Sequence, residues 1–271
     1  MAAVAPERYP ELTISFLRAD TADEQCVIEA DRLFEKFTTP NPKHPGYGAY
    51  QDGCSIVVLP ETFDEYWSGP AGYATRRKVR KALKEGYSFG LIDRNAYLDD
   101  IFAINTSMAE RQGKAMTEAY QTRPAPFDPL PDYTCPHHQI RTYGVLKDGH
   151  LVAYTWLYQV GEMCLFSTIL GHGEHLNAGI MYLLVAETIR DVMAVAGTRY
   201  AMYNMHASGT EGLRFFKEQM GFRPFWVYWQ RTDEIPDRRR PDPPRPRRQQ
   251  RFAPRRIVGA VARRARLIRP G

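Results

Sequence analysis

The stretch that decides the fold covers residues 163–222 and reads MCLFSTILG-HGEHLNAG-IMYLLVAETIRDVMAVA-GTR-YAMYNM-HASGT-EGLRFFKEQM-GF. Apolar runs of strand length alternate twice with segments whose apolar residues recur at helical spacing, which is the pattern of α/β units. The predicted elements, in the order strand, turn, helix, strand and helix, are residues 164–170, 171–179, 180–195, 200–205 and 211–220. The turn leads into a helix N-terminus, where unpaired N–H groups and the helix dipole favour an anion such as a phosphate.

The pattern before this stretch is purely β. Asp148-Gly149 is the signal of a tight hairpin between two predicted strands, so three consecutive antiparallel strands feed the helix. Farther upstream we expect a strand, a helix, and a loop or lid that contains five prolines, and after residue 221 a final aromatic strand. The two hairpin strands are residues 139–146 and 151–160. The upstream strand, helix and loop are residues 87–92, 95–113 and 122–136, and the final strand is 222–231.

In the N-terminal part the sequence predicts a strand at residues 11–17 and a helix at 21–37. A loop at 38–53, a buried strand at 55–60 and one or two helices at 61–86 follow. The segment 75–86 concentrates lysine and arginine. Such a charge run is either a solvated helix face over Val79, Ala82 and Leu83 or a phosphate-binding surface. The expected organisation is an N-terminal elaboration (1–86), a core (87–231) and an Arg/Pro-rich tail (232–271).

Composition bounds the class of protein. At 271 residues with 44% apolar content, the chain can bury a sizeable core. The cysteines Cys26, Cys54, Cys135 and Cys164 have no C-x-x-C spacing, which favours reduced thiols and a cytoplasmic protein. The N-terminus has no secretory signal pattern, and no apolar run is long enough to span a membrane.

The basic charge belongs to the C-terminal tail. Residues 237–271 contain thirteen arginines, two aspartates and no lysine, a net +11 against +5 for the whole chain, so residues 1–236 carry −6. Residues 255–269 fit an amphipathic arginine-rich helix, which suits an RNA backbone or an anionic membrane surface. The tail at 238–269 is therefore expected to bind tRNA, to attach the protein peripherally to a membrane, or to remain a disordered solubilising segment.

The order of elements over residues 87–231 resembles the GNAT acyltransferase fold, and Leu213-Arg-Phe-Phe-Lys-Glu-Gln-Met-Gly-Phe-Arg-Pro224 is similar to its closing helix and strand. The basic segment 76–86 and Ala109-Glu-Arg-Gln-Gly-Lys-Ala-Met116 resemble its FemAB-like or BioF2-like branch, whose members transfer amino acids from aminoacyl-tRNA or acyl groups from thioesters. The resemblance implies an α/β (α+β) fold with a mixed, mostly antiparallel sheet flanked by helices. It also implies N-acyltransferase activity on an amine acceptor, with acetyl-CoA, another acyl-CoA or aminoacyl-tRNA as donor.

The resemblance also implies where the donor binds. The strand at 164–170 should separate from the strand at 200–205 near Leu170, leaving an edge for the donor's amides and a backbone N–H near Thr168 for an oxyanion. The edge residues are Ser167, Thr168, Ile169 and Leu170, and the pyrophosphate cradle is His175, Leu176, Asn177, Ala178, Gly179 and Ile180. An ordinary turn capped by Asn177 is the alternative. The aromatic strand residues Tyr154, Trp156 and Tyr158 shape the acceptor pocket or are plain packing.

Acyl transfer to an amine requires a base, oxyanion donors and a proton for the leaving group. The candidates after the second parallel strand are Tyr203, Asn204, His206 and Ser208, with Glu174 or His172 in the cradle. His206 has the most useful unperturbed pKa, although a histidine at a strand end is often only a satisfied polar group. The position of the family's proton-donating tyrosine matches Phe216 here, which has no proton to give. Three alternatives follow: Tyr203 takes over that role, the leaving group needs no acid, or the chain is a catalytically inactive GNAT module that binds RNA or membrane.

The run Cys135-Pro-His137-His138 contains metal-ligating residue types. Without a second cluster, this spacing is a weak sign of zinc, so no metal is expected. Walker-type and dinucleotide-type glycine loops and a G-x-S-x-G elbow are absent from the sequence.

Overall fold

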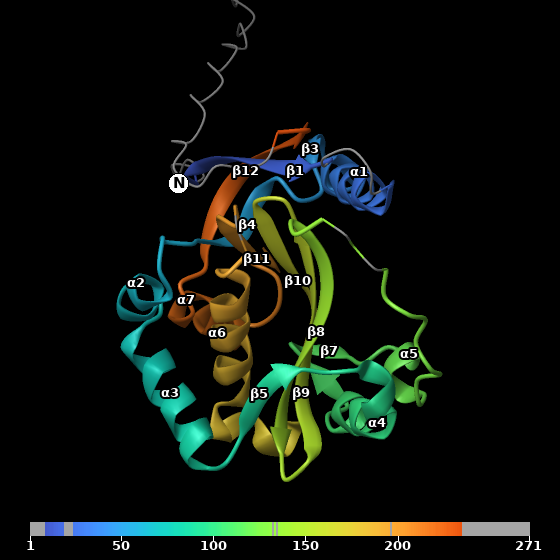
Figure 1. Cartoon of the computed structure of the whole chain (residues 1–271), viewed down its shortest axis with the longest axis vertical. Helices are drawn as coiled ribbons and strands as arrows, with labels where there is room; N and C mark the ends of the chain where they lie inside the picture. The colour runs from blue at the N-terminus through green and yellow to red at the C-terminus, as the bar shows by residue number, and fades with distance from the viewer. Residues whose placement is uncertain (1–8, 19–23, 132, 134, 196, 235–271) are drawn as a thin grey trace, which may run out of the picture.

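A computed structural model describes residues 9–18, 24–131, 133, 135–195 and 197–234. Eight strands form one sheet in the order β1-β12-β4-β11-β10-β9-β8-β5 (Figure 1). Their bounds are β1 Glu11–Leu17, β4 Asp52–Val58, β5 Ser88–Leu91, β8 His138–Lys147, β9 His150–Val160, β10 Met163–Gly171, β11 Tyr200–Met205 and β12 Arg223–Thr232. The pairs β1–β12 and β10–β11 are parallel and the other five are antiparallel, which confirms the mixed, mostly antiparallel sheet.

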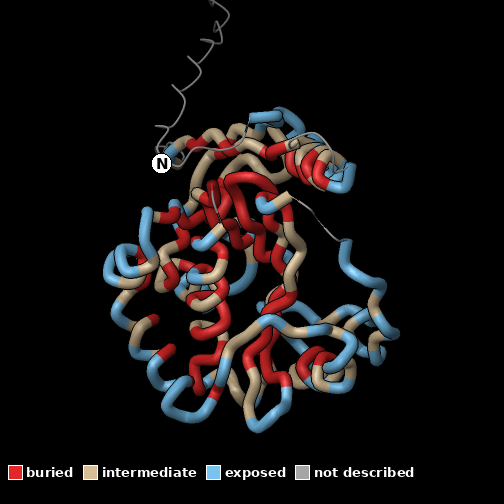
Figure 2. Tube along the Cα trace, in the orientation of Figure 1, coloured by how far each residue is buried: buried red, intermediate tan, exposed pale blue. Residues whose placement is uncertain are grey.

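Helices cover both faces of the sheet. The helices are α1 Glu24–Thr38, α2 Phe63–Ser68, α3 Tyr73–Lys84, α4 Leu98–Thr106, α5 Glu118–Gln121, α6 Ile180–Val192 and α7 Glu211–Gln219, with 3-10 turns η1 Arg94–Tyr97 and η2 Gly173–Ala178. Because strand side chains alternate between faces, Cys164 and Phe166 pack in one apolar cluster with α3 and α6, whereas Met163 and Leu165 pack in another with α1. Figure 2 shows the buried trace running through the sheet and α6.

Strands from the N-terminal part are integral to the sheet. β4 lies between β11 and β12, pairing Ile56 with both Met202 and Arg223, and β1 pairs along β12 from Glu11 to Leu17. The division at residue 86 stays a prediction, because elements from both sides of it share one sheet and one core.

Two predicted segments were wrong in detail. The segment 38–53 is not all loop, because it contains a small hairpin, β2 Pro40–Asn41 with β3 His44–Gly48, and the first residues of β4. The helix predicted at 95–113 ends at Thr106. There the hydroxyls of Thr106 and Ser107 donate to the carbonyls of Phe102 and Ile104, each at 2.8 Å, in competition with further helical bonds.

A second hairpin follows this helix, β6 Glu110–Arg111 with β7 Lys114–Ala115. Its two turn residues, Gln112 and Gly113, have φ of 54° and 73°. Positive φ at both central positions is the backbone of a tight two-residue hairpin turn. The predicted Asp148-Gly149 hairpin has the same form, with φ of 51° and 86°.

The predicted tail, including its amphipathic segment at 255–269, lies outside the described residues. Within the described residues, the longest apolar helices fall short of what crossing a bilayer requires.

Candidate functional site

The parallel strands β10 and β11 separate part-way along their length. Their register covers Met163–Tyr200, Cys164–Ala201 and Leu165–Met202 and then ends. Beyond it, β10 continues in its pairing with β9 on the other edge, from Thr168–Trp156 to Gly171–Ala153. The separation therefore begins five residues before the position expected near Leu170, and the whole run Ser167–Leu170 lies beyond it.

A cleft of about 170 Å³ opens where the two strands separate. Its lining comes from β10, the end of β11, the following turn, α7, the tip of the β6–β7 hairpin and α5. The lining residues are Ser167, Thr168, Ile169, Leu170, Tyr203, Asn204, Ser208, Leu213, Lys217, Gln112 and Tyr120. The structure thus brings together the predicted strand edge and three of the predicted polar residues, Tyr203, Asn204 and Ser208.

Two lining residues have an uncommon backbone conformation. Gln112 and Asn204 are non-glycine residues with φ of +54°, in the left-handed region. The Asn204 side chain stabilises its own turn, because its Oδ1 accepts the N–H of Met205 at 2.7 Å. The tip of the β6–β7 hairpin lies close to the turn that follows β11, since a Cβ on Gly209 would lie 2.8 Å from Gln112 Oε1.

Lys217 is a buried cation in the cleft wall. Its side chain leaves α7 and its Nζ donates to the carbonyl of Met205 at 2.7 Å and to Ser208 Oγ at 3.2 Å. It also lies 5.0 Å from the centroid of the Tyr203 ring. Burial lowers the pKa of this ammonium to about 8. An ammonium has three N–H donors, and these two hydrogen bonds use two of them.

Tyr203 and Ser208 frame this ammonium. Burial raises the pKa of Tyr203, so its hydroxyl is neutral across the physiological range. Its ring contacts Phe216 at a centroid separation of 6.4 Å. Ser208 Oγ donates to the Met205 carbonyl at 2.6 Å, which orients its lone pairs toward Lys217.

His206 lies outside the cleft lining that the described residues define. Its Nδ1 is 3.3 Å from Ser55 Oγ and its Nε2 is 3.4 Å from Glu218 Oε1, so both ring nitrogens are engaged. Burial lowers its pKa, against the opposing effect of Glu218. These contacts fit a satisfied polar group at the end of a strand better than a catalytic base.

The predicted cradle, residues 175–180, packs against α3. Gly179 has φ of +91°, and a Cβ there would lie 2.7 Å from the carbonyl oxygen of Lys78. Lys81 Nζ donates to the Asn177 carbonyl at 2.9 Å, and the Tyr87 hydroxyl is hydrogen-bonded to His175 Nδ1 at 2.7 Å. Close approach of α3 thus requires glycine at the entry to α6.

Some backbone N–H groups at the entry to α6 are hydrogen-bonded and others have no acceptor within the helix. Those of His175 and Gly179 are bonded to His172 O and Leu176 O, while both Tyr182 and Leu183 donate to Gly179 O. The amides of Ile180 and Met181 are then the ones that a helix start leaves without an intrahelical acceptor. Asn177 is not the helix N-cap, because Gly179 occupies that position.

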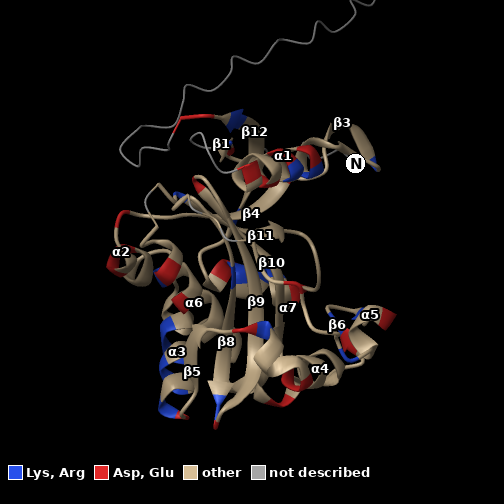
Figure 3. Cartoon of the chain, turned by 45° about the vertical axis from the view of Figure 1, so that its right-hand side comes forward, with Lys and Arg blue, Asp and Glu red and all other residues tan. Residues whose placement is uncertain are grey.

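Helix α3, which is rich in exposed cations, packs beside the entry to α6. Thr75, Val79 and Ala82 of α3 are buried, whereas Arg77, Arg80, Lys81 and Lys84 are exposed. Figure 3 shows the concentration of Lys and Arg along α3. The solvated face predicted for segment 75–86 is confirmed for Val79 and Ala82, which are buried beneath it, and is wrong for Leu83, which is 51% exposed. The position of this face beside the helix N-terminus also makes it a positively charged surface for an anion.

The three predicted acceptor residues lie on β9, away from the cleft lining of the described chain. Tyr154 is buried and donates to Asn105 Oδ1 at 2.8 Å, under α4. Trp156 packs edge-on against Phe127 of the proline-rich segment, with ring centroids 5.4 Å apart. Tyr158 lies under the Arg32 guanidinium at 5.3 Å. Their surroundings are those of packing residues.

A family model described as "Acetyltransferase (GNAT) domain" matches residues 73–214. This range covers more than half of the chain and includes β10, β11, the entry to α6 and every lining residue of the cleft except Lys217. The chain belongs to the GNAT acetyltransferase family. A comparison with curated proteins gives no match.

Several solved structures are similar to this GNAT chain at low identity. One is FemX, 12% identical, covering 63% of this chain and 58% of that chain with a TM-score of 0.49. Another is L-PGS from Bacillus licheniformis, 14% identical over 64% of this chain and 58% of that chain, with a TM-score of 0.40. A tandem GNAT protein from the clavulanic acid biosynthesis pathway is 16% identical over 78% and 59%, with a TM-score of 0.39. The chain spans less than two thirds of the length of each.

Sequence reasoning missed Lys217, although a signal was present. Leu213, Phe216 and Met220 mark the inward stripe of α7, and Lys217 stands four residues after Leu213 on that same stripe. A lysine at an apolar position of an amphipathic helix is buried with its charge, and such residues mark functional sites more often than surface lysines do.

Proposed function

We propose that this GNAT protein is an N-acyltransferase that binds an activated acyl donor in the cleft between β10 and β11 and transfers the acyl group to an amine. The observation that carries the proposal is the end of strand pairing at Leu165–Met202, which leaves Ser167–Leu170 along a cleft with a buried lysine in its wall. A free strand edge offers backbone N–H and C=O groups that bind an extended amide-containing ligand.

The anionic end of the donor would lie at the entry to α6. There the amides of Ile180 and Met181 coincide with the positive end of the helix dipole. Lys81, Arg77 and Arg80 of the neighbouring α3 add positive charge. This combination suits a phosphate or pyrophosphate, whether it belongs to a coenzyme A thioester or to the terminus of a tRNA.

The chemistry requires a neutral amine, which loses its proton to water before it attacks the acyl carbonyl. As the new C–N bond forms, the carbonyl oxygen becomes an oxyanion, and we assign its stabilisation to the Lys217 ammonium. The oxyanion then re-forms the carbonyl as the bond from carbon to the leaving sulfur or oxygen breaks. The attacking nitrogen, positively charged after C–N bond formation, gives up its proton to water, which later reprotonates the group that has protonated the leaving atom. The neutral Tyr203 hydroxyl is the cleft group that can protonate the leaving atom, in place of the family tyrosine that Phe216 replaces.

The alternative is a GNAT domain without catalysis that binds RNA or an anionic membrane. Phe216, which has no proton to give, is the observation that favours it. Against it, Tyr203 places a hydroxyl-bearing ring beside Phe216, and Lys217 is a buried charge in the cleft wall. Ion burial of this kind costs stability and is more readily understood if the charge has a function.

The test is a transfer assay with two donor classes. Full-length protein is incubated with a mixture of primary amines and either labelled acetyl-CoA, with longer acyl-CoAs in parallel, or labelled aminoacyl-tRNA, and products are separated by mass. Stable acylated amine with one donor class is expected. Binding of tRNA or anionic vesicles with no transfer from either donor class would support the non-catalytic alternative.

A variant of the charged face of α3 would distinguish between the two donor classes. For tRNA, replacing Arg77, Arg80 and Lys84 together with alanine should weaken binding and flatten its salt dependence, because each phosphate contact releases counterions. For acetyl-CoA the same variant should change KM by a smaller factor, since a single pyrophosphate meets fewer cations. Truncation after residue 236 tests the tail in the same assay.

A further inference from the structure

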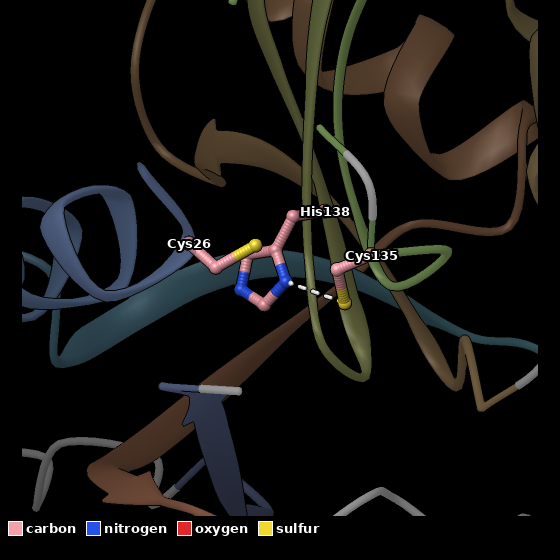
Figure 4. Close-up of side chains that lie close together, drawn as sticks. All are labelled: Cys26, Cys135 and His138. Carbon is pink, nitrogen blue, oxygen red and sulfur yellow. Dashed lines mark hydrogen bonds between the residues drawn. The ribbon is translucent and has the colours of Figure 1, made fainter. Parts of the chain in front are cut away.

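Two cysteines and a histidine from distant parts of the sequence meet on the opposite side of the sheet from α6. Cys26 comes from the first turn of α1, Cys135 ends the proline-rich segment, and His138 begins β8. Their ligand atoms, the two Sγ and one ring nitrogen, all lie within 4.8 Å of one another (Figure 4). None of the three lines the acyl cleft of the described chain.

The histidine is held in the tautomer that a metal requires. His138 Nε2 is 2.7 Å from the carbonyl oxygen of Leu17, at the end of β1. A carbonyl only accepts hydrogen bonds, so Nε2 carries the proton and Nδ1 presents a lone pair. That lone pair faces Cys135, with Nδ1 3.5 Å from Cys135 Sγ. A metal-bound histidine characteristically donates its other ring N–H to a carbonyl or carboxylate in this way.

We propose that Cys26 Sγ, Cys135 Sγ and His138 Nδ1 bind a structural zinc ion. In a tetrahedral site with Zn–S near 2.3 Å and Zn–N near 2.0 Å, neighbouring sulfur and nitrogen ligands lie about 3.5 Å apart. The observed separation of Cys135 Sγ and His138 Nδ1 matches this edge. Two thiolates and a neutral imidazole are soft and intermediate ligands, a set that selects zinc over magnesium or calcium.

A backbone donor lies beside one of the two sulfurs. The backbone N–H of His137 points at Cys135 Sγ, 3.4 Å away, and an N–H donor stabilises a thiolate more than a thiol. Two thiolates also neutralise the dication, so the buried cluster would carry no net charge. This matters because Cys26 and His138 are both fully buried.

The three residues provide three of the four positions of a tetrahedral site, and a further donor such as water would fill the fourth. Tyr133 precedes Cys135 by two residues, and its buried hydroxyl has no hydrogen-bond partner within the described residues. A metal-bound water would give this hydroxyl an acceptor or donor.

The site would join α1, the end of β1 and the start of β8. Cys26 and Cys135 are more than a hundred residues apart, so the metal closes a long loop and would stabilise the folded state against the unfolded chain. This is a structural role, independent of the proposed acyl transfer.

Metal content of the full-length protein tests the proposal. The protein is produced without a polyhistidine tag under reducing conditions, and zinc is measured by plasma mass spectrometry. Stoichiometric zinc is expected, with loss in Cys26→Ala, Cys135→Ala and His138→Ala. Three matched controls should retain it: Cys54→Ala and Cys164→Ala change buried cysteines outside the cluster, and His137→Ala changes the neighbouring histidine.

Cobalt provides a readout on the unaltered protein, so the proposal stays testable if a variant does not fold. After zinc removal, Co²⁺ should give the d–d bands of tetrahedral coordination and a thiolate charge-transfer band. Chelation should also lower the melting temperature of the wild type but not of Cys135→Ala. A reduced wild type that retains no zinc and gives no cobalt bands overturns the proposal, as does a Cys26–Cys135 disulfide in protein taken directly from cells.

Discussion

The Lys217 ammonium donates a 2.7 Å hydrogen bond to the carbonyl oxygen of Met205. This bond joins the last turn of α7 to the last residue of β11, at the point where β11 has already separated from β10. It fixes a buried positive charge in the wall of the cleft and prevents the lysine from folding out to solvent. The position of the charge, more than any residue expected from the sequence, defines the chemistry that we propose.

Lys217→Met should abolish most of the transfer activity while leaving the fold intact. Methionine has a similar length and fills the buried space, but it cannot stabilise an oxyanion. Loss of one such donor typically lowers kcat by about 100- to 1,000-fold. Steady-state kinetics with the accepted donor would measure the loss, and KM should change little, since the proposed interaction forms only with the tetrahedral intermediate.

The matched control is Lys43→Met, which removes an exposed lysine from the β2–β3 turn. It should retain wild-type kinetics. Equal activity of Lys217→Met and Lys43→Met would remove Lys217 from the mechanism.

The same Lys217→Met substitution should raise stability at neutral pH. Burial lowers the lysine pKa from 10.5 to about 8, so the unfolded chain binds the proton more tightly than the folded chain does. The resulting destabilisation is fully present below pH 8 and is relieved as pH rises from about 8 to 10.5. The Met205 carbonyl keeps the Ser208 N–H and hydroxyl as donors in the variant.

The measurement is the difference in melting temperature between Lys217→Met and the wild type as a function of pH. The variant should melt higher at pH 7, and its advantage should shrink toward pH 10. An advantage that grows with pH would mean that the folded state binds the proton more tightly, contrary to the burial argument.

His206→Gln should lower stability more than activity. The imidazole bridges Ser55 and Glu218 at 3.3 and 3.4 Å, and truncated hydrogen bonds of buried groups cost about 1–3 kcal/mol. We expect kcat/KM to fall by less than about tenfold, since general base catalysis is worth roughly 100-fold or more when removed. Urea unfolding and steady-state kinetics on one preparation would give both numbers. A far larger loss of kcat/KM with unchanged stability would restore His206 as the base.

Gly179→Ala should damage the entry to α6. A left-handed backbone strains alanine, typically by about 1–2 kcal/mol, and the new Cβ would also lie 2.7 Å from the Lys78 carbonyl. Gly149→Ala is the matched control, because Gly149 has φ of +86° and open space around its Cβ. Chemical denaturation should therefore show a larger loss for Gly179→Ala. Equal losses would indicate that α3 moves aside at little cost.

Local patterns predicted most of the elements. Strand β11 and helix α6 begin where their periodicity begins, and the Asp148-Gly149 turn folds as its sequence indicates. Where local signals compete, the prediction failed. The helix predicted to reach residue 113 stops at Thr106, because hydroxyl-to-carbonyl bonds and the Gln112-Gly113 turn favour a hairpin that apolar spacing alone does not reveal.

Pairings between distant segments were beyond the sequence. Nothing local to residues 52–58 specifies a place between β11 and β12, because that register comes from contacts with residues more than 140 positions away. The same applies to Cys26, which no spacing rule connects to Cys135 and His138. Lys217 was different, since its place on the apolar stripe of α7 could have been read from the helical period.

Amide hydrogen exchange, read by mass spectrometry with and without saturating donor, tests the role of the cleft most directly. With the donor that the transfer assay accepts, acetyl-CoA or aminoacyl-tRNA, exchange should slow at Ser167–Leu170 and at Ile180 and Met181. The exposed amides of the β2–β3 hairpin should exchange as before. Unchanged exchange at 167–170 under saturating donor would contradict the account, because the donor would then bind somewhere other than the edge where β10 leaves β11.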